Sequence, residues 1–524
     1  MATGAELTYN TSATALQMAN EIFGNGVTVV GASYTGAPAS KAIYGNGDAL
    51  SPFATPGNSG VILSTGNAAS FTQSSGDPNR SASTTADTSG PNNVAGFNAL
   101  VGTNTYDASY MDVDFIPTGT EMTLQFVFSS EEYPEYTGSI YNDAVGVWVN
   151  GAPVNLAIGS GQTTVNNLNP NTNLNLYVSN TGDQYNSEMD GFTLTLTLKM
   201  QVIAGVVNSI RIGIADVSDA KYDSNLLIAG NSAQTVLVAH SDAVTMGVSG
   251  TRNVDVLGND ASSTGSILTV THINGVAVVA GQQVTLPTGQ MVTLNADGTF
   301  TILGDGQTET VTFNYTIRDT LGNTDTAYVT VSQVPCFVAG TMILTPDGDV
   351  AVESLRPGDL VVTHDEGPQP LRWIGRRVVE AVGDFAPICI EADTFGCHDR
   401  LMVSPLHRIL IRDSLAELLF GEAEVLVAAR DLVNDDTVRQ IEGSFVEYVH
   451  LLFNRHQVVC SAGLLTESFL PGPQIAASFE QDMVAEITAI FPEISRDGAK
   501  YPEAARRTLR RHEAQVLMAT GLAA

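Results

Sequence analysis

Short runs of alternating polar and apolar residues fill the first 238 positions, and this alternation constrains the fold more than any other feature of the chain. Residues 123–128, TLQFVF, and 192–198, FTLTLTL, are two such runs, and Gly, Asn, Asp, Ser and Pro separate them from the next. Because side chains of a strand point alternately to two faces, such runs predict antiparallel strands in a sandwich. We expect residues 1–238 to form a jelly-roll-like β-sandwich, with one helix over 12–23 and a long surface loop over 64–93.

Domains usually have ~100–200 residues, so a chain of 524 residues is expected to contain several of them. The rest of the chain predicts three further units. Residues 239–334 keep the strand pattern and add Asp-Gly and Gly-Asn pairs, which predicts a small Ig-like sandwich with tight hairpins. From Cys336 onwards Arg and Glu become common, and we expect a third, all-β domain over 335–475. Helical spacing of apolar residues in 479–491 and 502–518 predicts a short helical tail within 476–524. The fold class is therefore mainly β.

The charge of the chain limits its partners. It has 23 basic and 55 acidic residues and a net charge of −32 at pH 7, which argues against a nucleic-acid or anionic-membrane partner. Carboxylates are preferred ligands of calcium, although solubility of a secreted protein explains an acidic surface equally well. The candidate calcium ligands are Glu131, Glu132, Asp143, Asp190, Asp216, Asp219 and Asp223. The alternative is that these carboxylates cap turns and face solvent.

Cys336 stands where the composition changes. A thiol at the first position of a domain can attack the carbonyl just before it, in an N-to-S acyl shift. That reaction also needs a proton donor for the departing amide nitrogen and groups that hold the oxyanion. Ser404 and His407, in the sequence Ser-Pro-Leu-His, are the candidates for these roles, and His450 and His456 are candidates for thioester breakdown. The alternatives are an inert thiol, a turn serine and structural imidazoles.

Three ordered blocks carry a resemblance to a known family: 336–343, CFVAGTMI; 352–361, VESLRPGDLV; and 404–407, SPLH. Over roughly 335–472 the chain resembles bacterial Hint domains, relatives of hedgehog and intein domains that process themselves. The resemblance implies a horseshoe of curved strands with the nucleophile in a central cleft. It also implies single-turnover self-cleavage at the bond before Cys336, with no cofactor.

Two departures from the intein pattern modify this expectation. Thr466-Glu467 stands where splicing inteins end in His-Asn, so we do not expect the flanking segments to be ligated. Pro335 places a rigid ring on the acyl side of the bond, which predicts a slow or conditional reaction.

The first two domains also carry resemblances. Residues 128–136, FSSEEYPEY, and 142–146, NDAVG, resemble choice-of-anchor L domains of bacterial surface proteins. Residues 255–260, DVLGND, and 295–300, NADGTF, resemble cadherin-like or VCBS-type repeats. These resemblances imply an extracellular or cell-surface protein with an Ig-like spacer, and a partner in the cell surface or matrix, including glycans.

Two negative features bear on export and on the cysteines. The first residues lack the basic and apolar regions of a signal peptide, and no run of ~18 apolar residues predicts a transmembrane segment. Type I export of an acidic, cysteine-poor protein fits this pattern. Cys389, Cys397 and Cys460 show no zinc spacing and are expected to be buried and inert.

The leading interpretation is a secreted or surface bacterial protein whose Hint domain severs itself from residues 1–335. The alternative is a surface adhesion, matrix-binding or glycan-binding protein whose Hint domain is an inactive scaffold.

Overall fold

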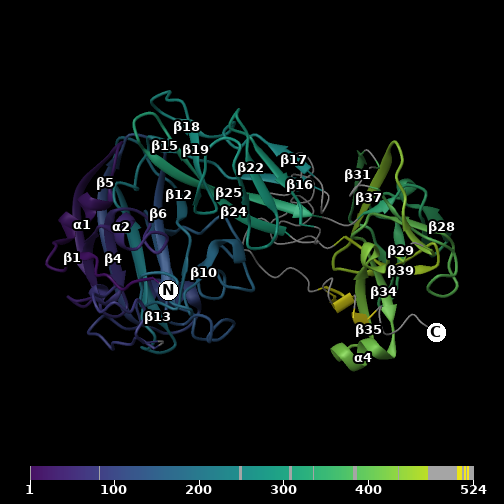
Figure 1. Cartoon of the computed structure of the whole chain (residues 1–524), viewed down its shortest axis with the longest axis horizontal. Coiled ribbons are helices and arrows are strands. Elements are labelled where there is room, and N and C mark those ends of the chain that lie inside the picture. The colour runs from purple at the N-terminus through teal and green to yellow at the C-terminus, as the bar shows by residue number, and fades with distance from the viewer. Residues whose placement is uncertain are drawn as a thin grey trace.

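The computed structural model describes residues 2–81, 83–246, 251–305, 310–333, 336–379, 381, 386–434, 436–469, 504–509, 513–514 and 516–517 (Figure 1). Three modules follow one another in it, and each is built on two main sheets, so the prediction of a mainly β chain is confirmed. Within this part of the chain, no helix has the length and apolar character that crossing a membrane requires.

The first sandwich packs two largely antiparallel sheets face to face. One sheet has the order β1 (Thr8–Asn10), β3 (Lys41–Gly45), β4 (Ser59–Ser64), β14 (Ser224–Ala229), β6 (Glu121–Ser130), β11 (Gly191–Thr193) and β10 (Tyr177–Ser179), with β12 (Leu196–Gln201) beside β6. The other has the order β2 (Val27–Thr35), β5 (Thr105–Pro117), β13 (Asn208–Val217), β7 (Ala144–Val149) and β8 (Ala152–Pro153), with β9 (Thr163–Thr164) beside β7. The helices are α1 (Ala15–Ile22), α2 (Gly47–Leu50), α3 (Ala95–Val101), η1 (Ala68–Ser70) and η2 (Leu174–Leu176).

The helix predicted over 12–23 is α1. Thr14 caps it, because its side chain accepts from the backbone N–H of Gln17 while the Gln17 side chain accepts from the backbone N–H of Thr14. Its buried face, Met18, Ala19 and Ile22, joins the core between the sheets.

The Ig-like unit is also a pair of sheets. One has the order β16 (Asp242–Met246), β25 (Thr324–Gln333), β24 (Thr310–Arg318), β19 (Thr269–Ile273) and β20 (Val276–Ala277), and the other β17 (Thr251–Val254), β23 (Phe300–Leu303), β22 (Met291–Leu294) and β21 (Gln283–Thr285). A short pair, β15 (Leu237–Val238) and β18 (Ala261–Ser262), lies at its entrance.

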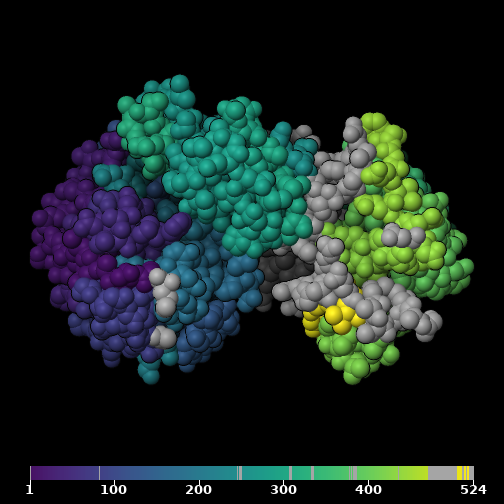
Figure 2. All heavy atoms as spheres, in the orientation of Figure 1, coloured from purple at the N-terminus to yellow at the C-terminus, as the bar shows by residue number. Residues whose placement is uncertain are grey.

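This unit packs directly on the first sandwich (Figure 2). Tyr328 of β25 is buried in the core of the first sandwich, and its hydroxyl accepts from the backbone N–H of Thr197 at 2.9 Å. Asp325, also on β25, is fully buried and accepts from Gln125 Nε2 of β6 at 3.3 Å. The Ig-like unit, predicted as a spacer, is therefore packed against the first sandwich through buried side chains of β25.

The third module holds the sequence around Cys336. One sheet has the order β31 (Trp373–Val379), β37 (Val446–Leu452), β26 (Phe337–Val338), β33 (Leu401–Val403), β32 (Ile388–Ile390) and β36 (Val438–Gln440). The other has the order β28 (Gly348–Ala351), β27 (Met342–Thr345), β38 (Val458–Ser461), β39 (Leu464–Glu467), β34 (Arg408–Arg412), β35 (Glu424–Ala428) and β40 (Arg507–Thr508). In addition, β29 (Leu360–Thr363) pairs with β38, and β30 (Gly367–Pro370) pairs with β29. The helices are α4 (Ser414–Phe420), η3 (Val352–Ser354) and η5 (Ala429–Leu432).

The tail only partly follows its prediction. Residues 479–491 lie outside the described residues, whereas 513–514 and 516–517 are helical. A helix through 502–518 was wrong at Arg507–Thr508, which forms β40 and pairs in parallel with β35. The free edge of β35 offers backbone partners there, and Leu509 becomes buried in the core of the third module.

Candidate functional site

The register of three strands brings three predicted site residues into one row. β26 lies between β33 and β37, and its Phe337 faces Val403 on one side and Val449 on the other. One residue back along β26, antiparallel pairing sets Cys336 between Ser404 and His450. Residues far apart in the sequence thus meet through strand register alone.

Ser404 holds the backbone of Cys336. Its Oγ accepts from the backbone N–H of Cys336 at 2.8 Å, and its own N–H donates to the Cys336 carbonyl at 2.9 Å. Pro405 sits at the second position of a turn closed by the His407 N–H on the Ser404 carbonyl at 3.0 Å. The hydroxyl of Ser404 therefore lies at the nitrogen that would depart if the bond before Cys336 broke.

His450 is the imidazole at the thiol. Its Nε2 lies 3.4 Å from Cys336 Sγ, and both side chains are buried. The ring stacks on Trp373 with 6.5 Å between centroids and meets Phe469 edge-on at 5.4 Å. Gly375 makes this possible, because a Cβ there would meet the Trp373 ring at 2.1 Å. An imidazole in this position can accept the thiol proton and leave a nucleophilic thiolate.

His407 lies behind the first residues of β26, with its ring centroid 4.2 Å from that of Phe337. Burial lowers the pKa of His407 to about 4, although Glu467 and the Cys336 backbone favour the protonated ring. Neither ring nitrogen makes a hydrogen bond of good geometry with the described residues. A neutral imidazole with unpaired nitrogens next to the Cys336 backbone suits the predicted roles at the oxyanion or the departing amine.

The contacts of His456 are with residues other than Cys336. Its Nε2 is 3.1 Å from the Ser468 carbonyl and 3.4 Å from Glu467 Oε2, and its Nδ1 accepts from the backbone N–H of Ala505 at 2.9 Å. Both ring nitrogens are therefore engaged by the end of β39 and by the tail. This geometry favours a positioning role over the predicted part in thioester breakdown.

Glu467 is the second residue of the pair Thr466-Glu467, which was expected at the place of the His-Asn pair of splicing inteins. It is fully buried and binds Arg408 twice, through the backbone N–H and through Nη1, both at 3.0 Å. Burial opposes ionisation, but Arg408 and His456 outweigh it and lower the pKa of Glu467 to about 2. A carboxylate ion-paired in this way cannot cyclise as asparagine does, which agrees with the expected lack of ligation.

The comparisons with known proteins agree with this geometry. Residues 335–473 match the family model of the Hint domain. The C-terminal part of the chain is a Hint domain. Residues 7–234 match the choice-of-anchor L domain, and residues 231–332 match a bacterial Ig domain. The choice-of-anchor L match favours a surface or extracellular protein. No curated protein matches the chain.

Solved structures resemble the chain weakly. The gp41-1 intein is 10% identical, covers 25% of this chain with 97% of its own and has a TM-score of 0.17. The M60 catalytic domain with two CBM51 domains of Clostridium perfringens ZmpB is 10% identical, covers 84% of this chain with 43% of its own and has a TM-score of 0.14. Scores this low carry no argument, so the Hint assignment depends on the family match.

Three residues of the site were missed from the sequence. Trp373 and Phe469 enclose His450, and Tyr448 packs against Cys336. The signal for Trp373 was present in the Arg372-Trp373-Ile374-Gly375 block, where the glycine two residues on makes room for a large ring. The expectation for the other cysteines was correct for Cys389 and wrong for Cys397, which is exposed, and for Cys460, which is half-buried.

The predicted calcium ligands form two groups in the first sandwich. Glu131 and Glu132 follow the end of β6 in a turn and have different neighbours. Glu131 lies with Asp190, whereas Glu132 lies with Asp143. Asp216, Asp219 and Asp223 belong with the second group. All seven are buried except Asp219, so the alternative of solvent-facing carboxylates is wrong for six of them.

The segment 64–93 covers part of this acidic region. Its backbone N–H at Ala86 donates to Asp223 at 2.8 Å, and Asn79 donates from its side chain to Asp190 at 2.7 Å. Burial raises the pKa of Glu131 to about 9 and that of Asp143 to about 7. The predicted surface loop is therefore a cover with buried inner contacts.

Calcium binding by these residues stays a prediction. Among the described residues, no three His, Cys, Asp or Glu side chains converge to hold a metal ion, so the seven predicted ligands do not form one site. Both oxygens of Glu131 and one of Asp216 have no hydrogen-bond partner there, which leaves oxygens for a cation.

We expect the first sandwich to unfold at a higher temperature with calcium than with a chelator at pH 8. Differential scanning calorimetry measures the two unfolding temperatures, and equal values would contradict this prediction.

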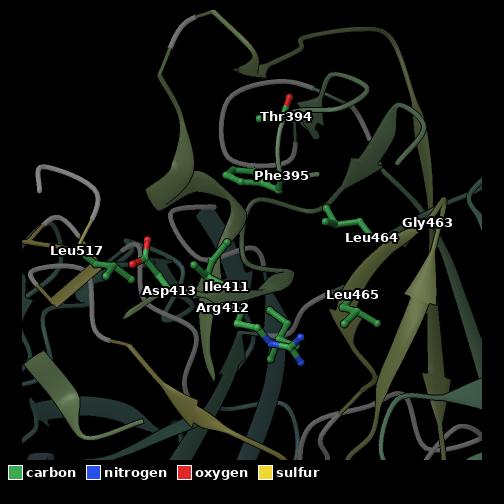
Figure 3. Close-up of a pocket in the computed structure, with 10 residues that line it drawn as sticks. Thr394, Phe395, Ile411, Arg412, Asp413, Gly463, Leu464, Leu465 and Leu517 are labelled. Carbon is green, nitrogen blue, oxygen red and sulfur yellow. The ribbon is translucent and has the colours of Figure 1, made fainter. Parts of the chain in front are cut away.

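A cavity of about 380 Å³ opens on the second sheet of the Hint domain (Figure 3). Ile411 and Arg412 of β34, Leu464 and Leu465 of β39, and Leu517 of the tail line it. None of the five predicted catalytic residues lines this cavity, so it is separate from the reaction site.

Proposed function

We propose that the Hint domain cleaves the chain at the bond between Pro335 and Cys336 and so releases the two N-terminal β modules. The observation that carries this proposal is the row Ser404, Cys336 and His450, in which the thiol lies 3.4 Å from an imidazole and the scissile nitrogen donates to a hydroxyl at 2.8 Å. Pro335 itself lies outside the described residues.

The proposed reaction has two steps, formation of a thioester and its hydrolysis. The Cys336 thiol gives its proton to His450 and attacks the Pro335 carbonyl, forming the C–S bond; the C–N bond breaks and the nitrogen takes up a proton to become a free amine. Ser404, which contacts that nitrogen, is the nearest hydroxyl for this transfer. Water then attacks the thioester, giving a carboxylate at Pro335 and restoring the thiol. The surroundings of His450 are apolar rings, which favour proton sharing over two separated charges.

The released part consists of a choice-of-anchor L domain packed on an Ig-like domain. The contacts of Tyr328 with Thr197 and of Asp325 with Gln125 join the two domains and support release as one piece. We further propose secretion or surface display by type I export, with binding to a cell-surface or matrix component. Immunoblotting of culture medium and cells with an antibody to the first sandwich checks the location; a signal confined to lysed cells contradicts it.

Incubation of the purified full chain with hydroxylamine tests the cleavage. We expect a fragment of residues 1–335 ending in a hydroxamate and a fragment of 189 residues that begins with Cys336, which together account for the 524-residue chain.

Loss of the general base in His450→Gln should slow the reaction by on the order of 10²-fold. The matched control is His272→Gln, a half-buried histidine of the Ig-like unit.

Intact-mass measurement over time gives the answer. A wild-type chain that stays whole under every thiol concentration and pH would reject cleavage and favour the adhesion protein with an inactive Hint scaffold. Fragments that form equally fast in His450→Gln would assign the base to another group.

A further inference from the structure

The tail returns to the Hint domain after the end of the family match at residue 473. Residues 504–509, which we call the tail clamp, lie along β35, with Val425 facing Arg507 and Leu426 facing Thr508. The backbone N–H of Leu509 donates to the Leu426 carbonyl at 3.0 Å, and the Leu509 side chain is buried. The clamp therefore extends a sheet of the domain by one strand.

Charge pairing fixes the clamp at its start. Arg506 Nε donates to Glu424 at 2.7 Å, and its Nη2 donates to Asp365 at 2.6 Å. Hydrogen bonds from Arg412 and Arg506 outweigh burial and lower the pKa of Glu424 to about 2. Arg506 thus joins the clamp to two acidic residues of the domain. Further along, Leu517 contributes to the wall of the cavity beside Asp413 (Figure 3).

The clamp also decides the tautomer of His456. Ala505 donates its backbone N–H to His456 Nδ1, so this nitrogen must carry a lone pair. The remaining ring proton of the neutral imidazole is then on Nε2, which lies 3.1 Å from the Ser468 carbonyl. The same Nε2 lies 3.4 Å from Glu467 Oε2, so its N–H also faces this carboxylate.

Glu467 connects this contact to the reaction site. Its carboxylate accepts from the backbone N–H of Arg408, the residue after His407. His407 in turn lies against Phe337, the residue after the nucleophile. An uninterrupted series of contacts thus runs from Ala505 through His456 and Glu467 to the wall of the site.

We infer that the tail clamp is a positioning element of the Hint domain: Ala505 holds His456 in its Nε2–H tautomer, which keeps the Glu467–Arg408 pair in place behind His407. The consequence for catalysis depends on the proposed cleavage, whereas the tautomer does not. His456 is a positioning residue in this scheme, since it contacts no reacting atom.

Ala505→Pro tests the inference, because proline has no backbone N–H and cannot donate to His456 Nδ1. In the full-length Cys336→Ala background, nitrogen NMR should show the Nε2–H tautomer of His456 while Ala505 is present, and a mixture of tautomers once Ala505→Pro is added. Ala505→Gly, which keeps the N–H, is the matched control and should retain the single tautomer. In the chain with Cys336 intact, cleavage should slow on the order of tenfold in Ala505→Pro, as expected for the loss of one hydrogen bond.

Arg506→Gln provides a second variant if proline prevents folding, since it weakens the clamp at Glu424 and Asp365 while leaving the N–H; it should broaden or split the His456 signals. Arg439→Gln, which removes a surface pair with Glu391, should leave them unchanged. An unchanged His456 tautomer in folded Ala505→Pro overturns the inference. A wild type that does not cleave rejects the proposed function, and the NMR result still stands because it is measured without cleavage.

Discussion

We expect Cys336→Ala to abolish the appearance of the 335-residue and 189-residue fragments, with no residual cleavage at that bond. Alanine has no atom that can form the thioester, so the reaction loses its first intermediate and not merely a fraction of its rate. The side chain fills a small, buried site beside Val446 and Tyr448, so removal of one sulfur leaves the packing largely intact. Gel electrophoresis and intact mass of the purified chain measure the effect.

Cys397→Ala is the control for general thiol chemistry. Cys397 is the exposed cysteine of the domain and lies outside the reaction row. We expect the Cys397→Ala chain to cleave at the wild-type rate. Cleavage at residue 335 that survives in Cys336→Ala would show that a host protease makes the cut, and the thioester scheme would then be abandoned.

Glu467→Ala should lower the free energy of unfolding of the Hint domain by ~3–5 kcal/mol, the usual cost of leaving one partner of a buried ion pair alone. Arg408, 13% exposed in its side chain, would lose the acceptor that now lies 3.0 Å from its Nη1. Chemical denaturation of the Cys336→Ala chain, followed by the Trp373 fluorescence of this domain, measures the change. Glu391→Ala removes a more exposed pair with Arg439 and should cost less than ~1 kcal/mol.

The same carboxylate predicts an acid limb. The pKa of Glu467 lies near 2 in the folded protein, below its ordinary value near 4.5. The folded state therefore binds this proton less tightly than the unfolded state, so the contribution of Glu467 to stability is complete above pH ~4.5 and is lost as the pH falls towards 2. Glu467→Ala should flatten this limb. Parallel pH profiles for variant and wild type would place the acid sensitivity elsewhere.

The sequence predicted the modules well because strand alternation and turn residues are local signals. Residues 123–128 lie within β6, and α1 falls inside the expected helix. The tail shows the limit of such signals. Helical spacing around Arg507 was overridden by the unpaired edge of β35, a partner more than eighty positions earlier that no local pattern reveals.

The sequence named the residues of the candidate site but not their arrangement. Cys336, Ser404 and His450 were named from residue chemistry and motif, yet their order across β33, β26 and β37 depends on strand register, which the sequence does not state. His456 illustrates the difference. Its residue type suggested catalysis, whereas its contacts with Ala505 and Ser468 assign it a supporting position.

One consequence of the central position of β26 concerns the product. Every strand that pairs with β26 lies later in the chain than Cys336, so the cut would remove no partner from the sheet. The shorter fragment would keep its fold and begin with an amine and a thiol on one residue, held beside an imidazole. Such a terminus is chemically equipped to capture a second activated acyl group, which makes the leftover domain a potential acceptor as well as a by-product.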